Sequence, residues 1–456
     1  MAHSRRCFLQ GGSSLAAALA VPGCARSDRR DSGVADTAGA TGAVRSEEPE
    51  PWSPPSPVDR NVFPTGVQTG DPRPSAVVVS VWTTAPSVTL VVLKADGSSA
   101  WIEVERRAGL VPTGGVFQTD LSGLEPDSAY TVGFVDEAGG GWSRAARIRT
   151  APAPDSLRIV QFGATSCLGG NAPWPTLTLA AEARLDFFAF LGDTVYADGS
   201  RSLEDYRVFW ELARRTRGFE DVTASTSMVA TWDDHEVGNN WSVEDVPEAQ
   251  LAAALQAFRE TMPQTTGGEG STLWRRLGFG QTLDVFVLDC RGERADGRYL
   301  SVAQMDWLKA GLASSDARFK VILNSVPITD LSAIFGQGGQ DDRWDGFPEQ
   351  RTEILQFIED AAVDGVLWVA GDVHYPQVGS VDPAGGIAER QTEVLAGPGG
   401  SFLNVGADLF QGDAQYAWMA AEWNYARFTC DPIAGTILVE HVADDGSLLN
   451  EVLLRP

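Results

Sequence analysis

Lysine, histidine and cysteine are all scarce in this chain of 456 residues, and acidic side chains far outnumber basic ones. The formal net charge is −26, which argues against non-specific binding to nucleic acid or to an anionic membrane surface. Five cysteines are too few for a fold held together by disulfide bonds. Because lysine occurs only as Lys94, Lys309 and Lys320, an anionic substrate would need a positive site made by a metal ion or by arginine.

The first residues of the chain are typical of an export signal and not of a folded domain. Arg5 and Arg6 resemble a twin-arginine motif, and an apolar stretch rich in alanine and glycine follows over residues 11–21. The sequence Val-Pro-Gly-Cys that ends at Cys24 resembles a lipobox, in which the thiol of that cysteine carries lipid; ordinary cleavage nearby would give a soluble product instead. We therefore expect residues 1–24 to engage the twin-arginine (Tat) export machinery, and the mature protein to be periplasmic or at the cell surface.

Residues 25–59 are rich in Asp, Glu, Ser, Pro, Gly and Ala, a composition that predicts a disordered linker. Over residues 60–150, short apolar runs such as 76–82 and 87–93 alternate with turn residues. This pattern predicts a small all-β domain of immunoglobulin or fibronectin type, with no visible catalytic residues.

After residue 155 apolar runs alternate with helical patterns, which predicts an α/β domain over residues 155–456. The predicted strands lie at 157–163, 187–191, 285–288, 319–323, 365–370 and within 425–454. The predicted helices lie at 177–184, 251–262, 301–312 and 350–361.

Polar side chains follow the predicted strands of this domain where each strand ends. The densest group is the stretch from Thr231 to Asn240, in which three carboxylates, a histidine and two carboxamides follow an apolar lead-in. Carboxylates this close repel each other unless a cation lies among them, and oxygen ligands with one imidazole suit a hard metal ion. Because function gathers past the carboxyl ends of strands in α/β sheets, we expect six strand ends to share one site. They carry Ser166-Cys167, Asp193 with Tyr196, Asp233 to Glu236, Asp289 to Arg294, Asn324, and Asp372 with His374.

The positions of the four histidines support a shared site. His235 and His374 both fall in strand-end clusters, whereas His3 lies in the predicted signal. We expect His441, in a predicted C-terminal strand, to have a structural role.

Four motifs follow one another along the chain: Asp193 with Tyr196, Trp-Asp-Asp-His-Glu at 232–236, Leu-Asp-x-Arg-x-x-Arg at 288–294 and Gly-Asp-Val-His at 371–374. Together they resemble the PhoD-type alkaline phosphatase/phosphodiesterase family of the calcineurin-like metallophosphoesterase superfamily. The resemblance implies a layered β-sandwich core flanked by helices, preceded by the small all-β domain. It is weakest after His374, so it says less about substrate preference than about metal binding.

The resemblance implies a binuclear metal site, with a ferric ion and calcium in the characterised type. Asp193 would be the carboxylate that bridges both ions. Cys167, Tyr196 and His374 would complete the Fe³⁺ shell, since a thiolate and a phenolate stabilise the higher oxidation state.

The second ion would be held by Asp234, Asn324 and Asp372. These oxygen ligands stand where the superfamily often has nitrogen ligands, which shifts the expected ion towards Ca²⁺. Asp233 is expected behind these ligands, and Asn240 would either bind metal or brace the loop through its backbone.

The resemblance also implies catalytic roles. His235 would be the general acid, or would stabilise the transferring phosphoryl group, with Glu236 orienting its ring while a metal-bound hydroxide attacks phosphorus. Arg291 is a candidate phosphate clamp, a role that Arg294 would share. The alternative for Arg291 is a salt bridge to local carboxylates.

We interpret the chain as an exported, metal-dependent phosphoesterase that hydrolyses small-molecule or lipid phosphoesters, either monoesters or diesters. A phospholipase-D-like phosphodiesterase is a close alternative, and a metallohydrolase of a non-phosphate ester is another. An alternative of a different class is a cell-surface binding protein with a degenerate metal domain. The intact set of Asp193, Tyr196, Asp234, His235 and His374 argues against the last of these.

Overall fold

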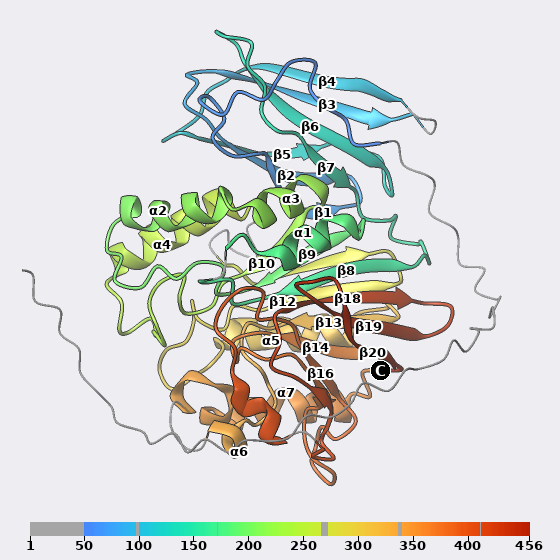
Figure 1. Cartoon of the computed structure of the whole chain (residues 1–456). Coiled ribbons are helices and arrows are strands. Elements are labelled where there is room, and N and C mark those ends of the chain that lie inside the picture. Colours follow the sequence, from blue (N-terminus) through green and yellow to red (C-terminus); the bar gives the residue numbers. More distant parts are fainter. Residues whose placement is uncertain (1–49, 97–99, 171, 266–271, 336–339, 411) are drawn as a thin grey trace, which may run out of the picture. The chain divides into compact units, whose positions relative to one another are not determined.

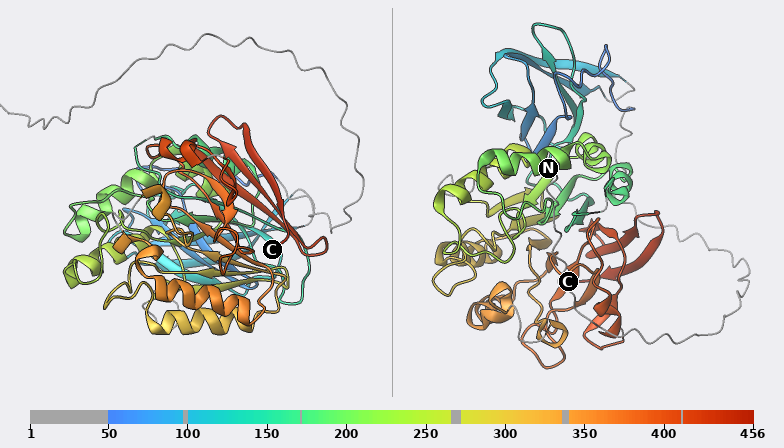
Figure 2. Two further views of the ribbon diagram at one scale, coloured as in Figure 1. Left: turned by 90° about the horizontal axis from the view of Figure 1, so that it is seen from below. Right: turned by 60° about the vertical axis from the view of Figure 1, so that its left-hand side comes forward.

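The computed structural model describes residues 50–96, 100–170, 172–265, 272–335, 340–410 and 412–456 (Figure 1). The predicted export signal and the predicted linker up to residue 49 lie outside the described residues, so both stay predictions. The last ten residues of the expected linker are ordered instead, because Trp52 packs edge to face on Trp142 and Val58 forms a β-bridge with the same residue. Two large β-sheets stack face to face at the centre of the fold, and helices cover both outer faces (Figure 2). No helix in the described part of the chain combines the length and apolar character needed to cross a membrane.

The first sheet has nine strands in the described residues, and its neighbouring strands β8, β9, β10 and β1 run parallel. Strands β9 and β10 are buried along their whole length, as expected when a sheet is covered on both faces. The order across the sheet is β20 (Leu448–Leu454), β19 (Thr436–Ala443), β18 (Asn424–Asp431), β8 (Val160–Thr165), β9 (Phe187–Leu191), β10 (Met228–Thr231), β1 (Gln68–Arg73), β2 (Ala76–Trp82) and β5 (Val116–Ser122).

The second sheet has seven strands in the same part of the chain, and β12, β13, β14 and β16 run parallel. Their β-branched and aromatic residues are buried without interruption, as in other doubly covered strands. The order is β11 (Arg275–Phe279), β12 (Leu283–Val287), β13 (Phe319–Leu323), β14 (Val366–Ala370), β16 (Thr392–Leu395), β15 (Gln377–Ser380) and β17 (Tyr416–Met419).

The main apolar core fills the space between these two sheets. Phe162 stacks on Phe187 and on Phe428 from the first sheet, and the same core contains Val285 and Val321 from the second. Burial of this surface is the main force that holds the two sheets together.

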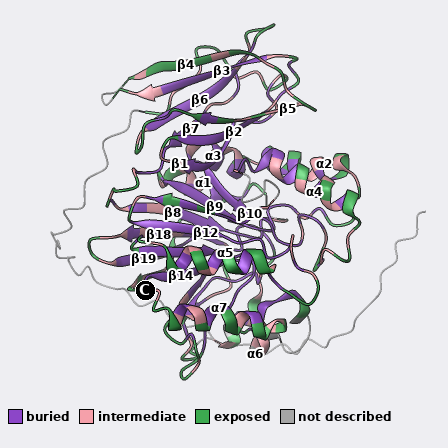
Figure 3. Cartoon of the chain, turned by 180° about the vertical axis from the view of Figure 1, so that it is seen from behind, coloured by how far each residue is buried: buried purple, intermediate pink, exposed green. Residues whose placement is uncertain are grey.

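The helices are amphipathic and cover the outer faces, so the buried strands contrast with exposed helix faces (Figure 3). Helices α1 to α4 pack on the first sheet, and α5 and α7 pack on the second. Their bounds are α1 (Pro175–Glu182), α2 (Leu203–Arg214), α3 (Arg217–Ser225), α4 (Glu248–Thr261), α5 (Val302–Ala313), α6 (Ser332–Phe335) and α7 (Pro348–Asp360), with 3-10 turns η1 (Gln340–Asp342), η2 (Trp344–Gly346) and η3 (Val405–Phe410).

The helices predicted at 177–184, 251–262, 301–312 and 350–361 correspond to α1, α4, α5 and α7. The sequence interpretation missed α2 and α3. The signal for α2 is present, because the Ser202 hydroxyl caps the Asp205 backbone N–H while the Asp205 carboxylate caps the Ser202 backbone, which is a capping box.

The N-terminal β region has an apolar core of its own, as a sandwich over residues 60–150 requires, in which Val79 clusters with Leu90 and Val132, but one of its two sheets is shared with the rest of the fold. Strands β1, β2 and β5 extend the nine-stranded sheet, with β1 parallel to β10 at Gly70 and Met228. Only β4 (Trp101–Leu110), β3 (Val88–Ala95), β6 (Ala129–Asp136) and β7 (Ala146–Arg149) form a separate four-stranded sheet. The predicted boundary near residue 150 therefore does not separate two independent sheets.

Candidate metal centre

The carboxyl ends of the parallel strands lie level in both sheets. In the first sheet Thr165 pairs with Phe190, and Leu191 pairs with Thr231, so the loops after β8, β9 and β10 leave one edge. In the second sheet Leu323 pairs with both Val287 and Val369, which aligns the loops after β12, β13 and β14. The predicted gathering of the strand-end residues is therefore built into the strand register.

Four predicted ligands have a left-handed backbone, which non-glycine residues rarely adopt. The φ angles are 54° at Cys167, 54° at Asp193, 69° at Asp372 and 61° at His374. Such strain persists only where the surroundings enforce it, and it concentrates at functional sites. Gly192, with a φ of 97°, is required here because a Cβ would lie 2.4 Å from the Cβ of Asp233.

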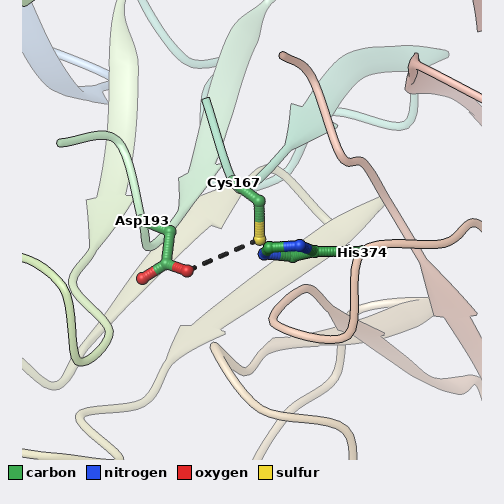
Figure 4. A group of neighbouring side chains, drawn as sticks. All are labelled: Cys167, Asp193 and His374. Carbon is green, nitrogen blue, oxygen red and sulfur yellow. Dashed lines mark hydrogen bonds between the residues drawn. The ribbon is translucent and has the colours of Figure 1, made fainter. Parts of the chain in front are cut away.

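The first group of predicted ligands converges on Asp193 (Figure 4). The ligand atoms of Cys167, Asp193 and His374 all lie within 4.8 Å of one another, and Cys167 Sγ is 3.7 Å from Asp193 Oδ2. The Tyr196 hydroxyl lies 3.2 Å from that same oxygen and 3.1 Å from His374 Nε2. It also lies 3.1 Å from the hydroxyl oxygen of Ser401, a residue that the sequence interpretation missed.

The second group shares Asp193 with the first. The ligand atoms of Asp193, Asp234 and His235 also lie within 4.8 Å of one another. The Asp234 carboxylate is fixed from both sides, because it accepts the backbone N–H of His235 at 2.9 Å and that of Asn240 at 2.7 Å. The backbone of Asn240 therefore braces the loop, one of the two roles considered for it.

The buried carboxylates of the centre are costly to ionise. Burial, followed by the charge of Asp234, raises the pKa of Asp193 well above its ordinary range. Burial, followed by the charge of Asp233, does the same to the pKa of Asp372. Burial and the charge of Asp193 likewise raise the pKa of the Cys167 thiol. A bound cation reverses this balance, because it favours the deprotonated form of every group around it.

The donor atoms present fit a binuclear metal group. Cys167, Tyr196 and His374 offer a thiolate, a phenolate and an imidazole, a set that suits a trivalent transition metal. Burial lowers the pKa of His374 to about 4, which keeps its imidazole neutral and able to bind metal. Asp193 belongs to both groups, and one carboxylate can serve two ions.

A carboxylate distant in sequence orients His235. Its Nδ1 lies 2.7 Å from Asp198 Oδ2, and the other Asp198 oxygen accepts the backbone N–H of Asn239 at 2.7 Å. The imidazole also stacks on the Tyr196 ring, with 4.1 Å between ring centroids. Asp198 is a site residue that the sequence interpretation missed, although it follows Tyr196 by two positions.

Glu236 is placed differently from the expectation that it orients His235. Its carboxylate accepts three backbone N–H groups: Asp193 at 3.0 Å, Thr194 at 2.7 Å and Asp233 at 2.9 Å. It therefore ties the loop after β9 to the loop after β10, and Asp198 takes the orienting role.

Arg291 is fully buried and pairs with carboxylates, the alternative considered for it. Its Nε donates to Asp233 Oδ1 at 2.6 Å, and its Nη1 contacts the Asp342 carboxylate. Arg294 donates to the same Asp342 at 2.9 Å and contacts the backbone oxygen of Trp241. The structure thus shows the salt bridges considered for Arg291, while its Nη2 is buried without a hydrogen-bond partner, and the phosphate-clamp role stays a prediction.

Of the other predicted ligands of the second ion, Asn324 is fully buried and Asp372 is partly buried. The Asn324 amide oxygen lies 2.8 Å from Cys290 Sγ, and its amide nitrogen is buried without a hydrogen-bond partner. Asp372 contributes to the raised pKa of Asp193 and of Cys167. The role of these two residues as ligands stays a prediction. Cys167, Cys290 and Cys430, the cysteines of the described residues, are all free thiols.

A pocket of about 340 Å³ opens beside the His235 side of the centre. Its lining includes Asp198, Asn239 and Trp241. A larger cavity of about 780 Å³ lies elsewhere, where Trp52 and Arg144 of the N-terminal β region face α1 and α3. Its lining contains none of the predicted ligands, so the larger cavity is not the location of the candidate metal centre.

Comparisons with known proteins show which proteins this chain is similar to. Alkaline phosphatase D of Bacillus subtilis (strain 168) is 28% identical over 312 residues, which cover 56% of this chain and 52% of that protein. The match thus spans about half the length of the curated relative. A solved structure of PhoD superposes with a TM-score of 0.75 at 22% identity, covering 88% of this chain and 90% of that one. A purple acid phosphatase from yellow lupin (Lupinus luteus) seeds superposes with a TM-score of 0.63 at 14% identity, covering 86% and 75%.

The two structural likenesses show a shared fold, a sheet-rich α/β architecture of the metallophosphoesterase type. The family is shown by a separate match, in which the PhoD-like phosphatase model covers residues 162–404. This range runs from β8 to just past His374 and Ser401, so it includes both groups of ligands. Since it makes up more than half of the sequence, the chain belongs to the PhoD-like phosphatase family.

Proposed function

We propose that this protein is an exported phosphoesterase that hydrolyses organic phosphoesters at a binuclear metal centre. The observation that carries the proposal is the position of Asp193, whose carboxylate belongs to both groups of ligand atoms. Membership of the PhoD-like phosphatase family and the similarity to Alkaline phosphatase D support the phosphoesterase class. The twin-arginine sequence at Arg5 and Arg6 supports export.

Cys167, Tyr196, His374 and Asp193 would hold Fe³⁺. Asp193 and Asp234, with Asn324 and Asp372 as further oxygen donors, would hold Ca²⁺. The bound ions would polarise the phosphoryl group and lower the pKa of water, so that water can supply the nucleophile near neutral pH.

A side chain of the protein, His235, would protonate the leaving group. Asp198 holds Nδ1 of His235, which leaves Nε2 to give a proton to the departing oxygen. Stacking on Tyr196 fixes the plane of the same ring. A donor held on two sides keeps its position, and positioning of this kind lowers the activation barrier.

The test is metal content measured in parallel with hydrolysis of p-nitrophenyl phosphate and bis(p-nitrophenyl) phosphate. We expect bound iron and calcium, and hydrolysis that a chelator abolishes and added metal restores. The ratio of the two rates separates a monoesterase from a diesterase. Metal without turnover of either ester would contradict the phosphoesterase proposal, and a metal-free protein exported by its native route would favour the binding-protein alternative.

A matched variant separates catalysis from metal binding. His235→Ala should reduce turnover by about a hundredfold, within the range expected for loss of a general acid, while both metals stay bound. Full turnover in that variant would remove His235 from the proposed chemistry.

A further inference from the structure

Phe402 is largely exposed although it lies against a predicted metal ligand. Its side chain is 71% exposed, and its ring meets the His374 ring edge to face with 4.1 Å between centroids. The preceding residue, Ser401, contacts the Tyr196 hydroxyl. Phe402 therefore forms part of the wall beside the metal centre.

The backbone around this exposed ring is anchored on both sides. The Ser401 N–H donates to the Cys167 carbonyl at 2.9 Å, and the Asn404 N–H donates to the His374 carbonyl at 3.0 Å. Trp423 Nε1 donates to the Ser401 carbonyl at 2.5 Å. The exposure of Phe402 is thus a feature of a fixed segment that is tied to two predicted ligands.

Two further exposed apolar side chains follow Phe402 on the same segment. Val405 is 69% exposed and Leu409 is 85% exposed, whereas Ala407 between them is buried in an apolar cluster. Val405, Ala407 and Leu409 lie on η3, which begins three residues after Phe402. We call Phe402, Val405 and Leu409 the apolar rim.

A single exposed apolar residue needs no explanation, but three on one short segment, the first of them packed on a predicted metal ligand, point to a binding surface. These side chains offer an anionic group neither a charge nor a hydrogen bond, whereas an alkyl chain or an aryl ring gains by covering them because burial of apolar area is favourable. Tyr196 lies between the two histidines, with its ring on His235 and its hydroxyl on His374. If His235 serves the leaving oxygen, the rim beside His374 is next to the other substituent of phosphorus.

We infer that the apolar rim binds the non-leaving ester group of a phosphodiester substrate, and that this group is an alkyl chain or an aryl ring. The inference rests on the proposed phosphoesterase function and adds a substrate class and a residue that determines specificity. Since the rim touches a part of the substrate that does not react, its contribution should appear mainly in KM and little in kcat.

The experiment uses p-nitrophenyl methyl, butyl and octyl phosphates, each at a concentration below that at which the ester forms micelles. The leaving group is the same in all three diesters, so only the non-leaving chain varies. In the wild-type protein kcat/KM should rise with chain length, by up to about fourfold for each methylene that the rim covers. Phe402→Ser should flatten this rise, and Phe402→Leu should restore most of it.

Ile433→Ser is the matched control, because Ile433 is 75% exposed in the turn between β18 and β19, far along the sheet from the centre. The control should keep the wild-type dependence on chain length. Leu409→Ser provides a second rim variant should Phe402→Ser fail to fold, and it should also reduce the rise.

Equal kcat/KM for the three diesters, or a rise that Phe402→Ser leaves unchanged, would overturn the inference while the methyl ester still reports phosphodiesterase activity. Hydrolysis of none of the three would instead be the failure of the proposed function. Sedimentation of wild type and Phe402→Ser adds a further arm: a dimer that dissociates in the variant, with no change in chain-length dependence, would assign the rim to self-association and overturn the inference.

Discussion

Asp198 Oδ2 lies 2.7 Å from Nδ1 of His235 and fixes the direction in which that imidazole points. The second Asp198 oxygen binds the Asn239 backbone, so the carboxylate is itself held in place. An outer residue that orients a site imidazole in this way commonly affects function almost as strongly as the residue it supports. Asp198 is therefore a positioning residue in the proposed mechanism.

The variant Asp198→Asn should lower kcat by about 10- to 100-fold while both metals stay bound, because an amide cannot hold the imidazole as a carboxylate does. Metal analysis and steady-state kinetics on the same preparation check this. Asp245→Asn is the matched control, since Asp245 lines the same pocket but binds Ser242 instead of His235. An unchanged kcat in Asp198→Asn would show that the contact is not used.

Tyr196 is predicted to give the iron-loaded protein its colour. A phenolate bound to Fe³⁺ produces a visible charge-transfer band, and the Tyr196 hydroxyl already lies 3.2 Å from Asp193 and 3.1 Å from His374. Tyr196→Phe should remove the band in an absorption spectrum of protein with measured iron content. A colourless wild type that contains iron would contradict the assignment.

The location of the site could be predicted from the sequence, because strand ends and ligand types are both local features. Asp193 and Asp234 follow neighbouring strands, and parallel register brings them to one edge of the first sheet. His374 follows β14 of the second sheet and meets them because the two sheets stack face to face. Which carboxylate reaches His235 could not be read in the same way. Glu236 is its neighbour in sequence, but the turn directs that carboxylate to backbone N–H groups, and Asp198 reaches the ring from another loop.

The burial of individual polar side chains and the order of strands in the sheets could not be predicted from the sequence pattern. Arg291 has the right chemistry for a phosphate clamp, but only the packed structure shows that Asp233 and Asp342 enclose it. The sandwich expected over residues 60–150 has its own core, but nothing local reveals that β1 pairs with β10 and so joins it to the nine-stranded sheet. Pairing between distant segments depends on the whole core and not on the composition of either strand.

Replacement of Arg291 should reduce stability. Arg291→Met leaves Asp233 buried without its cationic partner and Asp342 with Arg294 alone, which should cost about 3–5 kcal/mol in the free energy of unfolding. Urea denaturation measures the loss, and Arg298→Met offers a control at an arginine of the same loop region. A stable Arg291→Met protein with a raised KM for phosphoesters would instead support the phosphate-clamp role of Arg291.

His441 should make the fold sensitive to mild acid. Burial lowers its pKa to about 4 from 6.5, and its Nε2 lies 3.1 Å from the Leu395 carbonyl. The unfolded chain takes up a proton on His441 near pH 6.5, whereas the folded chain does so only near pH 4. The buried neutral imidazole therefore leaves the full free energy of unfolding intact above pH 6.5. The free energy of unfolding then falls by about 3 kcal/mol in total as the pH drops from about 6.5 to about 4.

Denaturation of wild type and His441→Gln between pH 8 and 4 isolates this contribution, because the carboxylates of the metal centre titrate equally in both proteins. The variant should be less stable at pH 8 and should lose less stability on acidification. Parallel profiles for the two proteins would show that His441 does not contribute.

The central claim is that Asp193 serves two metal ions, and metal stoichiometry of three purified proteins tests it most directly. The wild type should contain iron and a second metal, and Cys167→Ser should lose iron while it keeps the second metal. Asp193→Asn should lose both ions, since its carboxylate belongs to both groups of ligands. An Asp193→Asn protein that retains either metal at wild-type occupancy would contradict the shared carboxylate and the binuclear centre built on it.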